Sequence, residues 1–167
     1  MRRIVPASQA LAVVTSEDLR IGGLTVLGEA RGEPFQGWLA ISWVILNRVL
    51  YDLRGDDKPD WWGEGIEGVC RKANQFTCWS EAEDNRRNRE RMDAATFSDP
   101  VFLGCYAAFV AVVAAARGAP FPGDIATDPT QGSTHYYRVG TPIPAWARPR
   151  TPVGAIGHHL FFNDVET

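Results

Sequence analysis

Two glutamates flank an arginine in the densest polar cluster of the sequence, Gly28-Glu29-Ala30-Arg31-Gly32-Glu33-Pro34. Glu33 precedes a proline that can start a helix, so its carboxylate is expected to satisfy free amides at that helix's N-terminus. Glu29 falls at the end of the preceding predicted helix, where the helix dipole disfavours a negative charge, and its neighbours Leu27 and Ala30 are apolar. These surroundings favour a protonated Glu29 carboxyl, which is what a general acid requires.

A protonated carboxyl suits cleavage of a glycosidic bond, because the leaving oxygen must receive a proton as the bond breaks. Glycosidases commonly use a pair of carboxylates, and the sequence shows no evident partner for Glu29. An ordinary helix-end glutamate that is salt-bridged to Arg31 explains the same pattern without catalysis. The local sequence therefore leaves both interpretations open.

Histidines and cysteines offer competing chemistry. The histidines are His135, His158 and His159. No cysteine or aspartate stands at a spacing that completes a zinc site with them, so we expect no metal and no cofactor, and a zinc amidase is the least favoured enzyme class. Cys78 could pair with His135 as nucleophile and base, although nothing local indicates an activated thiol. A Cys70–Cys78 disulfide is left open, and Cys105 is expected to be buried.

Aromatic side chains with polar neighbours are frequent, and six of the residues are tryptophan. Planar apolar faces combined with hydrogen-bonding tips suit a sugar cleft, where rings stack on the C–H faces of the sugar. Each of these residues could equally pack in the core. The candidates are Gln75, Phe76, Trp79, Tyr136, Tyr137 and Trp146.

Three predicted helices would position these groups. Thr15 and Asp18 form a capping-box pattern that starts a helix over residues 16–30, with Glu29 at its end. A second helix starts at Pro34 and ends near residue 51, and a third starts at Asp99-Pro100 and ends before residue 118. Glycines at 22 and 23 weaken the first helix, which suggests that another backbone approaches it closely.

The remaining segments are less regular. Residues 52–67 are predicted to form an exposed loop anchored by Trp61 and Trp62, and residues 80–97 a solvated helix face of mixed charge. The last third is rich in glycine and proline, with short strands over 134–138 and 160–162. Helices followed by a loop-rich small-strand region predict an α+β fold.

Composition limits the function classes. The 167 residues, 45% of them hydrophobic, suit one domain with one core, and the net charge of −3 argues against nucleic acid as the main partner. No apolar run reaches the roughly 18 residues of a membrane-spanning helix, so we expect no membrane insertion. The first residues make a poor signal peptide, because polar residues and Pro6 interrupt the apolar stretch. We expect a flexible leader over residues 1–14 and a single catalytic domain over residues 15–167.

The same segments resemble the SleB-type bacterial cell-wall hydrolases, a family that includes spore cortex-lytic enzymes and phage relatives. The resemblance covers about residues 19–163. It rests on four blocks in order: Leu27 to Pro34 continuing through Ile45-Leu46-Asn47-Arg48-Val49; Asn74-Gln75-Phe76-Thr77-Cys78-Trp79; Gly132-Ser133-Thr134-His135-Tyr136-Tyr137; and Ala145-Trp146 followed by Ile156-Gly157-His158-His159-Leu160-Phe161-Phe162.

This resemblance implies a lysozyme-like fold and cleavage of peptidoglycan between N-acetylmuramic acid and N-acetylglucosamine, with Glu29 as the catalytic acid. It favours lytic transglycosylation, in which the C6 hydroxyl attacks its own anomeric carbon, so that one carboxyl serves as acid and then base. The implied substrate cleft contains Gln75, Phe76, Thr77, His135, Tyr136, Tyr137, Trp146 and His159. Structural support is expected from Arg31, Glu33 and Asn47.

Two departures from the family pattern bear on the setting. The residue before the terminal histidine is commonly asparagine in the family and is His158 here. The second expected departure is that the protein lacks a convincing signal peptide and a separate wall-binding module. We therefore expect a monomer that stays cytoplasmic until it is released to the periplasm or cell wall, as a phage endolysin is. Hydrolytic muramidase chemistry, and a non-catalytic wall-binding or particle-structural role, are the alternatives beside the zinc amidase.

Overall fold

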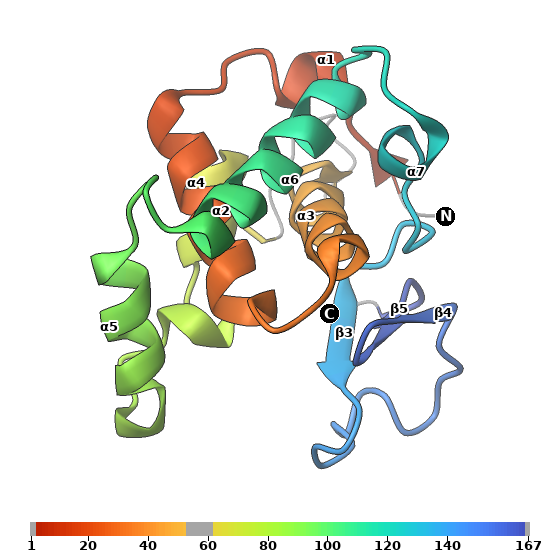
Figure 1. The fold of residues 1–167 in the computed structure, drawn as a ribbon. Helices are drawn as coiled ribbons and strands as arrows, with labels where there is room; N and C mark the ends of the chain where they lie inside the picture. Colours follow the sequence, from red (N-terminus) through yellow and green to blue (C-terminus); the bar gives the residue numbers. More distant parts are fainter. Residues whose placement is uncertain (1–2, 53–61, 166–167) are drawn as a thin grey trace.

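The computed structural model describes residues 3–52 and 62–165 of the chain. Three long helices form its centre: α2 (Ser16–Ala30), α3 (Phe35–Val49) and α6 (Pro100–Ala116). A small sheet lies beside α3, and shorter helices surround this centre (Figure 1). The three predicted helices are thus confirmed, and the second one ends two residues earlier than expected.

The start of α2 follows from its capping box. The Asp18 amide donates to the Thr15 hydroxyl at 3.1 Å, and the Thr15 amide donates to the Asp18 carboxylate at 2.9 Å. Gly22 and Gly23 then face α6, where a Cβ at Gly22 would lie 2.0 Å from the Phe109 ring. A Cβ at Gly23 would lie 3.0 Å from the Tyr106 Cα, so the expected close approach of a backbone is confirmed at Gly23, whereas Gly22 makes room for the Phe109 side chain.

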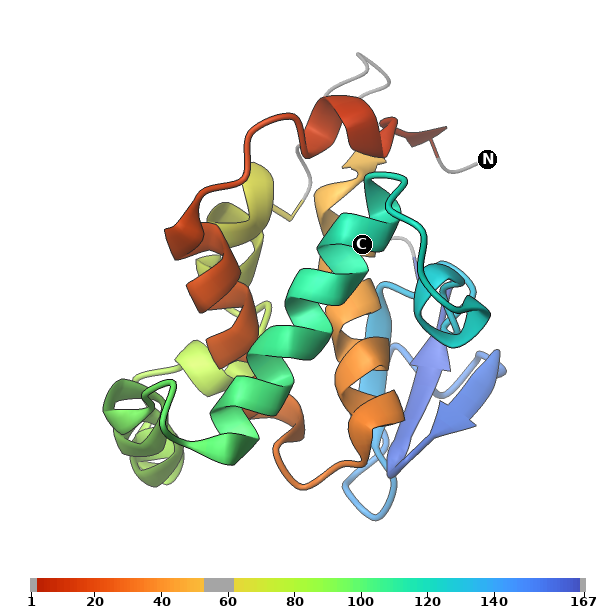
Figure 2. The same ribbon diagram turned by 45° about the horizontal axis from the view of Figure 1, so that its top comes forward.

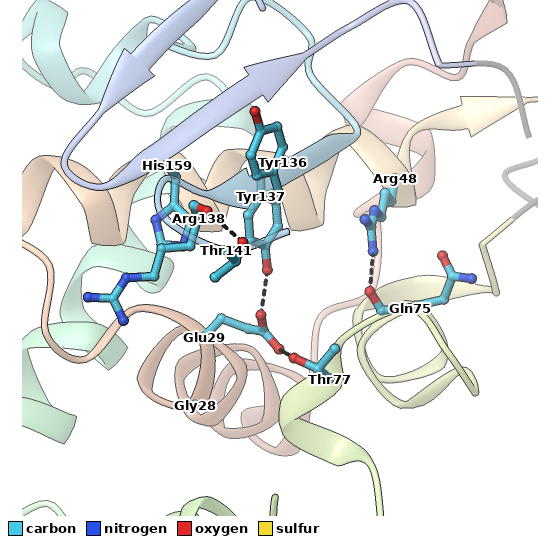
Figure 3. Close-up of a pocket in the computed structure, with 10 residues that line it drawn as sticks. All are labelled: Gly28, Glu29, Arg48, Gln75, Thr77, Tyr136, Tyr137, Arg138, Thr141 and His159. Carbon is cyan, nitrogen blue, oxygen red and sulfur yellow. Dashed lines mark hydrogen bonds between the residues drawn. The ribbon is translucent and has the colours of Figure 1, made fainter. Parts of the chain in front are cut away.

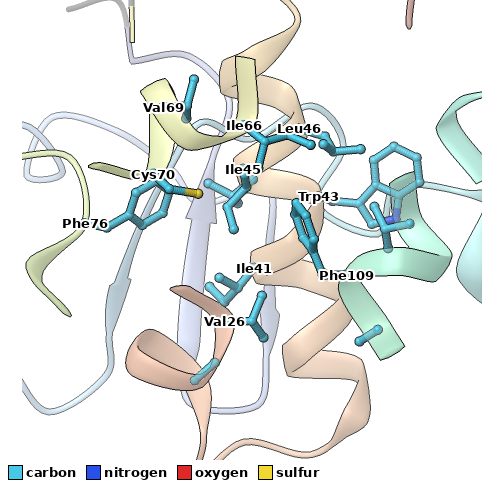
Figure 4. Close-up of a cluster of buried hydrophobic side chains, with 14 of the residues drawn as sticks. Val26, Ile41, Trp43, Ile45, Leu46, Ile66, Val69, Cys70, Phe76 and Phe109 are labelled. Atoms are coloured by element: carbon cyan, nitrogen blue, oxygen red, sulfur yellow. The ribbon is translucent and has the colours of Figure 1, made fainter. Parts of the chain in front are cut away.

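α3 runs through the core (Figure 4). Every residue from 39 to 46 is buried, and eight successive residues cover all directions around a helix. A helix that is apolar on every side must be covered on every side, and here α2, α6 and α4 (Gly65–Arg71) supply the cover. The burial of α3 is therefore wider than the single apolar stripe expected from the sequence.

The sheet contains three antiparallel strands in the order β3 (His135–Arg138), β5 (His159–Phe162) and β4 (Gly154–Ile156). Two of these strands were predicted, and together with the helices they confirm the α+β class. Side chains alternate between the two faces of a strand. His135 and Tyr137 therefore share one face, and Tyr136 and Arg138 share the other.

The prediction of a flexible leader over residues 1–14 is wrong for the described part of that segment. Strand β1 (Arg3–Ile4) pairs with β2 (Tyr51–Asp52), and the short helix α1 (Ala7–Ala10) follows. Val5 and Leu11 are each only 1% exposed. Leu11 packs in the main core, and the segment lies across the end of α3 (Figure 2), although Pro6 and polar residues separate Val5 from Leu11 in the sequence.

The predicted loop over 52–67 lies mostly outside the described residues, as does Trp61. Trp62 is described and buried at 2% exposure, and α4 begins at Gly65, inside the predicted loop. The mixed-charge segment forms the 3-10 turn η2 (Glu83–Asn85) and the helix α5 (Arg86–Ala94), where Arg86 pairs with Glu83 and Glu90. Helix α7 (Gly123–Ala126) precedes the sheet. None of the described helices is long and apolar enough to cross a membrane.

Candidate active site

Glu29 lies in the last turn of α2, and three donors from two other segments reach its carboxylate (Figure 3). The Cys78 amide donates to Oε1 at 2.8 Å and the Thr77 hydroxyl to the same oxygen at 3.3 Å. The Tyr136 hydroxyl donates to Oε2 at 2.7 Å. Glu29 thus lies where the end of α2, the 3-10 turn η1 (Thr77–Trp79) and strand β3 meet.

The two oxygens of Glu29 differ chemically. The Cys78 amide can only donate, so Oε1 must accept a hydrogen bond in every protonation state. The Tyr136 hydroxyl can either donate or accept, so Oε2 can carry a proton and donate it to that hydroxyl. Burial, followed by the charge of Glu29, raises the pKa of Tyr136 well above its ordinary value, which keeps the phenol protonated. Oε2 is therefore better placed than Oε1 to hold and release a proton, because the Cys78 amide occupies Oε1 at 2.8 Å and the Thr77 hydroxyl lies farther away, at 3.3 Å.

Turn η1 is tied closely to α2. A Cβ at Gly28 would lie 2.5 Å from the Cys78 Cβ, so glycine is what allows the turn to approach the helix. Trp79 Nε1 donates to the Thr25 hydroxyl at 2.9 Å, one helical turn before Glu29. Asn88 of α5 donates to the Gly28 carbonyl at 3.0 Å. These contacts hold the Cys78 amide in position to reach Glu29.

Arg48 is a site residue that the sequence reasoning missed. It is 5% exposed at the end of α3, and its guanidinium donates to the Thr134 carbonyl at 2.8 Å and to the Gln75 carbonyl at 3.0 Å. Burial lowers the pKa of Arg48, while the opposing charge of Glu29 raises it. A single side chain therefore joins the segments before β3 and η1. The available signal was a charged residue inside the otherwise apolar helix over residues 35–49.

Asn47, expected to give structural support, anchors the loop that leads into β3. Its side-chain amide donates to Asp128 at 2.9 Å and to the Ser133 carbonyl at 3.0 Å. Asp128 in turn accepts the Thr130 amide at 2.8 Å. Asn47 and Arg48 thus act from successive positions of α3 on the segment that delivers Tyr136.

Two pockets meet at Glu29. The larger has a volume of about 420 Å³, and the smaller, of about 240 Å³, shares Gly28, Glu29 and Arg138 with it. Open space on both sides of one carboxyl suits a chain-like substrate that continues past the point of cleavage. The larger pocket is lined by Gly28, Glu29, Arg48, Gln75, Thr77, Tyr136, Tyr137, Arg138, Thr141 and His159.

Five predicted cleft residues therefore line the pocket beside Glu29, namely Gln75, Thr77, Tyr136, Tyr137 and His159. Phe76, Trp146 and His135 do not line this pocket, although Phe76 lines another pocket of about 420 Å³ that also borders Thr77. Phe76 is 3% exposed in the core, beneath the Arg48 guanidinium at 4.5 Å.

His135 and Trp146 lie on the other face of the sheet from Glu29. Their ring centroids are 5.0 Å apart, and Trp146 also packs against Phe162 at 5.2 Å. Trp146 adjoins a small apolar cluster made by Ala147, Phe162 and Val165. The alternation of the strands explains the separation, because His135 is one residue away from Tyr136 and must point to the opposite face.

Glu33 does not cap α3, contrary to prediction. The N-cap position is Pro34, which makes no side-chain cap bond. Glu33 instead accepts the His158 backbone amide at 2.9 Å and contacts His158 Nδ1 at 3.1 Å. Its carboxylate therefore fixes the turn between β4 and β5, far away in the sequence. His159, in the next position, is 5% exposed, and burial lowers its pKa.

Arg31 does not pair with Glu29. Its guanidinium donates to the Asn88 side-chain oxygen at 2.7 Å, and no ion pair joins Arg31 to Glu29 in the described part of the chain. The alternative of a helix-end glutamate neutralised by Arg31 is therefore not what the structure shows. The support that Arg31 gives goes to helix α5.

The cysteines lie buried as free thiols, so the open question of a Cys70–Cys78 disulfide is answered against the bridge. Burial raises the pKa of Cys70 to about 12 and that of Cys78 higher still. A thiol held in its neutral form is a poor nucleophile, so these surroundings do not support a Cys78–His135 pair. Within residues 3–52 and 62–165, no group of three or more histidine, cysteine, aspartate or glutamate residues could hold a metal ion.

Comparisons with known proteins agree on one protein family. Residues 32–162 match the cell wall hydrolase family. Spore cortex-lytic enzymes of Halalkalibacterium halodurans and Bacillus subtilis are each 26% identical over 96% and 88% of this chain. The chain spans only 39% and 38% of the length of these two curated relatives.

Two solved structures share the fold. The catalytic domain of Bacillus cereus SleB superposes with a TM-score of 0.57 at 23% identity, covering 89% of this chain and 91% of that one. The catalytic domain of the germination-specific lytic transglycosylase SleB of Bacillus anthracis gives 0.58 at 22% identity, with 89% and 95% covered. The expected lysozyme-like α+β fold and the expected SleB-type resemblance are thereby confirmed.

Proposed function

This chain belongs to the cell wall hydrolase family, and on that premise we propose that it cleaves peptidoglycan glycan strands by lytic transglycosylation, with Glu29 as acid and base. The observation that carries the proposal is the position of Glu29 where two pockets meet. One carboxylate oxygen accepts a backbone amide, and the other contacts the Tyr136 hydroxyl, which can either donate or accept a hydrogen bond. Curated relatives named spore cortex-lytic enzymes give the substrate class.

In the first step, the proton on Oε2 of Glu29 passes to the glycosidic oxygen. The bond between that oxygen and C1 of N-acetylmuramic acid breaks, and its electron pair stays with the oxygen. The positive charge that develops at C1 faces a carboxylate, which stabilises it. In the second step, O6 of the same sugar bonds to C1, and its proton returns to Glu29. The ring closes as a 1,6-anhydro sugar without consuming water.

The lining of the two pockets favours this route over hydrolysis. A hydrolase of the inverting or retaining type needs a second carboxylate, either to activate water or to attack C1. Glu33 is the other carboxylate that lines these pockets within the described residues, and it is occupied by His158. A transglycosylase needs no such partner, because the attacking hydroxyl belongs to the substrate.

Replacement of Glu29 by glutamine tests this assignment. Glutamine keeps an oxygen for the Cys78 amide and offers an NH₂ group to the Tyr136 oxygen, so Glu29→Gln is expected to fold normally but release no soluble muropeptides from purified sacculi. Glu64→Gln, at an exposed position before α4, is the matched control and should retain full activity. Wild-type rates for folded Glu29→Gln protein would refute the assignment.

The setting belongs to the same proposal. We expect the protein to act at the bacterial cell wall as a monomer. We also expect the protein to be released from the cytoplasm to the cell wall in the way that a phage endolysin is. A non-catalytic wall-binding protein would instead retain intact peptidoglycan in a pull-down without producing soluble fragments, so the activity of wild-type protein on sacculi decides between them.

A further inference from the structure

Arg138 lies at the exposed end of β3, where it lines both pockets beside Glu29. Figure 3 shows its guanidinium on the opposite side of Glu29 from Arg48 and Gln75. Its backbone carbonyl accepts the Thr141 hydroxyl, but within the described residues its guanidinium has neither a hydrogen-bond partner nor an ion-pair partner. The planar guanidinium of Arg138, with its N–H donors, thus borders the two pockets without a bound partner. The two pockets together are called the groove below.

Positive charge gathers at this end of the groove. Arg31 also lines the smaller pocket, and its partner, the Asn88 amide oxygen, leaves its charge uncompensated. Arg91 lies close enough to lower the pKa of Arg31, after the larger effect of burial. The two carboxylates of the smaller pocket, Glu29 and Glu33, already accept hydrogen bonds from other groups.

We propose that Arg138, with Arg31 beside it, binds a carboxylate carried by the glycan, so that this end of the groove is a subsite for an anionic muramyl residue. The inference rests on the proposed function and adds to it the feature of the substrate that is recognised. The sugar rings and N-acetyl groups of peptidoglycan are neutral. Its carboxylates come from the lactyl ether of muramic acid or from the peptide attached there, and either one matches the bidentate geometry of a guanidinium.

Binding can be measured apart from catalysis by using Glu29→Gln protein, which is expected not to consume its ligand. The probes are two kinds of soluble glycan strand, one bearing peptides and one stripped of peptides by an amidase to expose the lactyl carboxylates. Each kind is used in its native form and after carbodiimide amidation, which removes the negative charge but keeps the sugar. Dissociation constants are measured by calorimetry at constant ionic strength.

We expect Glu29→Gln protein to bind at least one native strand about tenfold more tightly than its amidated form. The kind of strand that shows the difference identifies the carboxylate. Glu29→Gln/Arg138→Gln protein should lose this preference, whereas Glu29→Gln/Arg117→Gln protein should keep it. Arg117 is an exposed arginine at the end of α6 and does not line either pocket.

Equal affinity for native and amidated strands would overturn the inference, as would a preference that survives Arg138→Gln. Neither result would affect the proposed function, which stands or falls on cleavage of sacculi by wild-type protein. If wild-type protein cleaves nothing while the Arg138-dependent preference is present, the anionic subsite holds and the proposed chemistry fails.

Discussion

The surroundings of Glu29 distinguish its two carboxylate oxygens. Oε1 accepts a hydrogen bond from the Cys78 backbone amide, which can only donate. Oε2 contacts the Tyr136 hydroxyl, which can either donate or accept. Tyr136 therefore does more than line the pocket. In the proposed mechanism it accepts or donates a hydrogen bond as the Glu29 proton leaves and returns, and its ring packs against His159 and Phe161.

Replacing Tyr136 by phenylalanine tests this role. The ring contacts remain, so we expect the fold and thermal stability to change little, while kcat on soluble glycan strands falls about 10- to 100-fold because Oε2 loses its partner. Tyr106→Phe, an aromatic replacement on α6 away from the groove, should leave kcat unchanged. An unchanged kcat for Tyr136→Phe would show that the hydroxyl has no part in the proton transfer.

The residues found from the sequence and those missed differ for a physical reason. Glu29 became a candidate because local sequence reveals its place at the end of a helix, and the family resemblance gave it the role of acid, which remains a proposal. Arg48 could not, because its partners are two carbonyls that come together only in the folded chain. Phe76 and Trp146 lie away from the pocket beside Glu29, because aromatic type alone does not distinguish a core position from a cleft position.

At the scale of elements, the groove is assembled by side chains that cross between segments. Arg48 joins the segments before β3 and η1, and Glu33 holds the turn between β4 and β5. That turn consists of Gly157 and His158, and Gly157 has a φ of 57°. A Cβ there would lie 1.9 Å from Oε2 of Glu33, so the hairpin depends on glycine both for its backbone and for space.

Alanine substitution in this hairpin therefore has a position-dependent effect. Gly157→Ala should lower the free energy of unfolding by roughly 2 kcal/mol or more, because it adds backbone strain and displaces Glu33. Gly154→Ala, in β4 of the same hairpin, meets nothing within 4 Å and should stay within about 0.5 kcal/mol of wild type. Urea denaturation measures both. Equal effects of the two variants would argue against the Glu33 contact.

Helices were easier to predict than their connections. The capping box at Thr15 and the Asp99-Pro100 start are local signals, and both helices begin where these signals place them. Glu33 was expected to cap the nearby helix, because the chain segment that claims it lies more than a hundred residues away. A contact between residues so far apart in the sequence cannot be predicted from the residues next to Glu33.

At the scale of the whole molecule, the N-terminal segment is part of the packed structure. Leu11 is 1% exposed in the main core, and strand β1 pairs with β2 beyond the end of α3. Pro6, Ser8 and Gln9 interrupt the apolar stretch between Val5 and Leu11, and this interruption is what led to the prediction of a flexible leader.

Truncating Leu11 should therefore cost stability. We expect Leu11→Ala to lower the free energy of unfolding by about 3 kcal/mol, through lost burial and the cavity left behind. Val13→Ala, two residues on at a side chain that is 82% exposed, should change it by less than about 0.5 kcal/mol. Similar stability of the two variants in urea denaturation would restore the view of a loosely attached leader.

We propose that Glu29 cleaves the glycan without water, and mass spectrometry of the products released from purified sacculi tests this claim. Lytic transglycosylation predicts fragments that end in 1,6-anhydro-N-acetylmuramic acid, each one water lighter than the corresponding reducing fragment, and no such fragments from Glu29→Gln protein. Reducing ends in the wild-type digest would contradict the claim, because they require a water nucleophile.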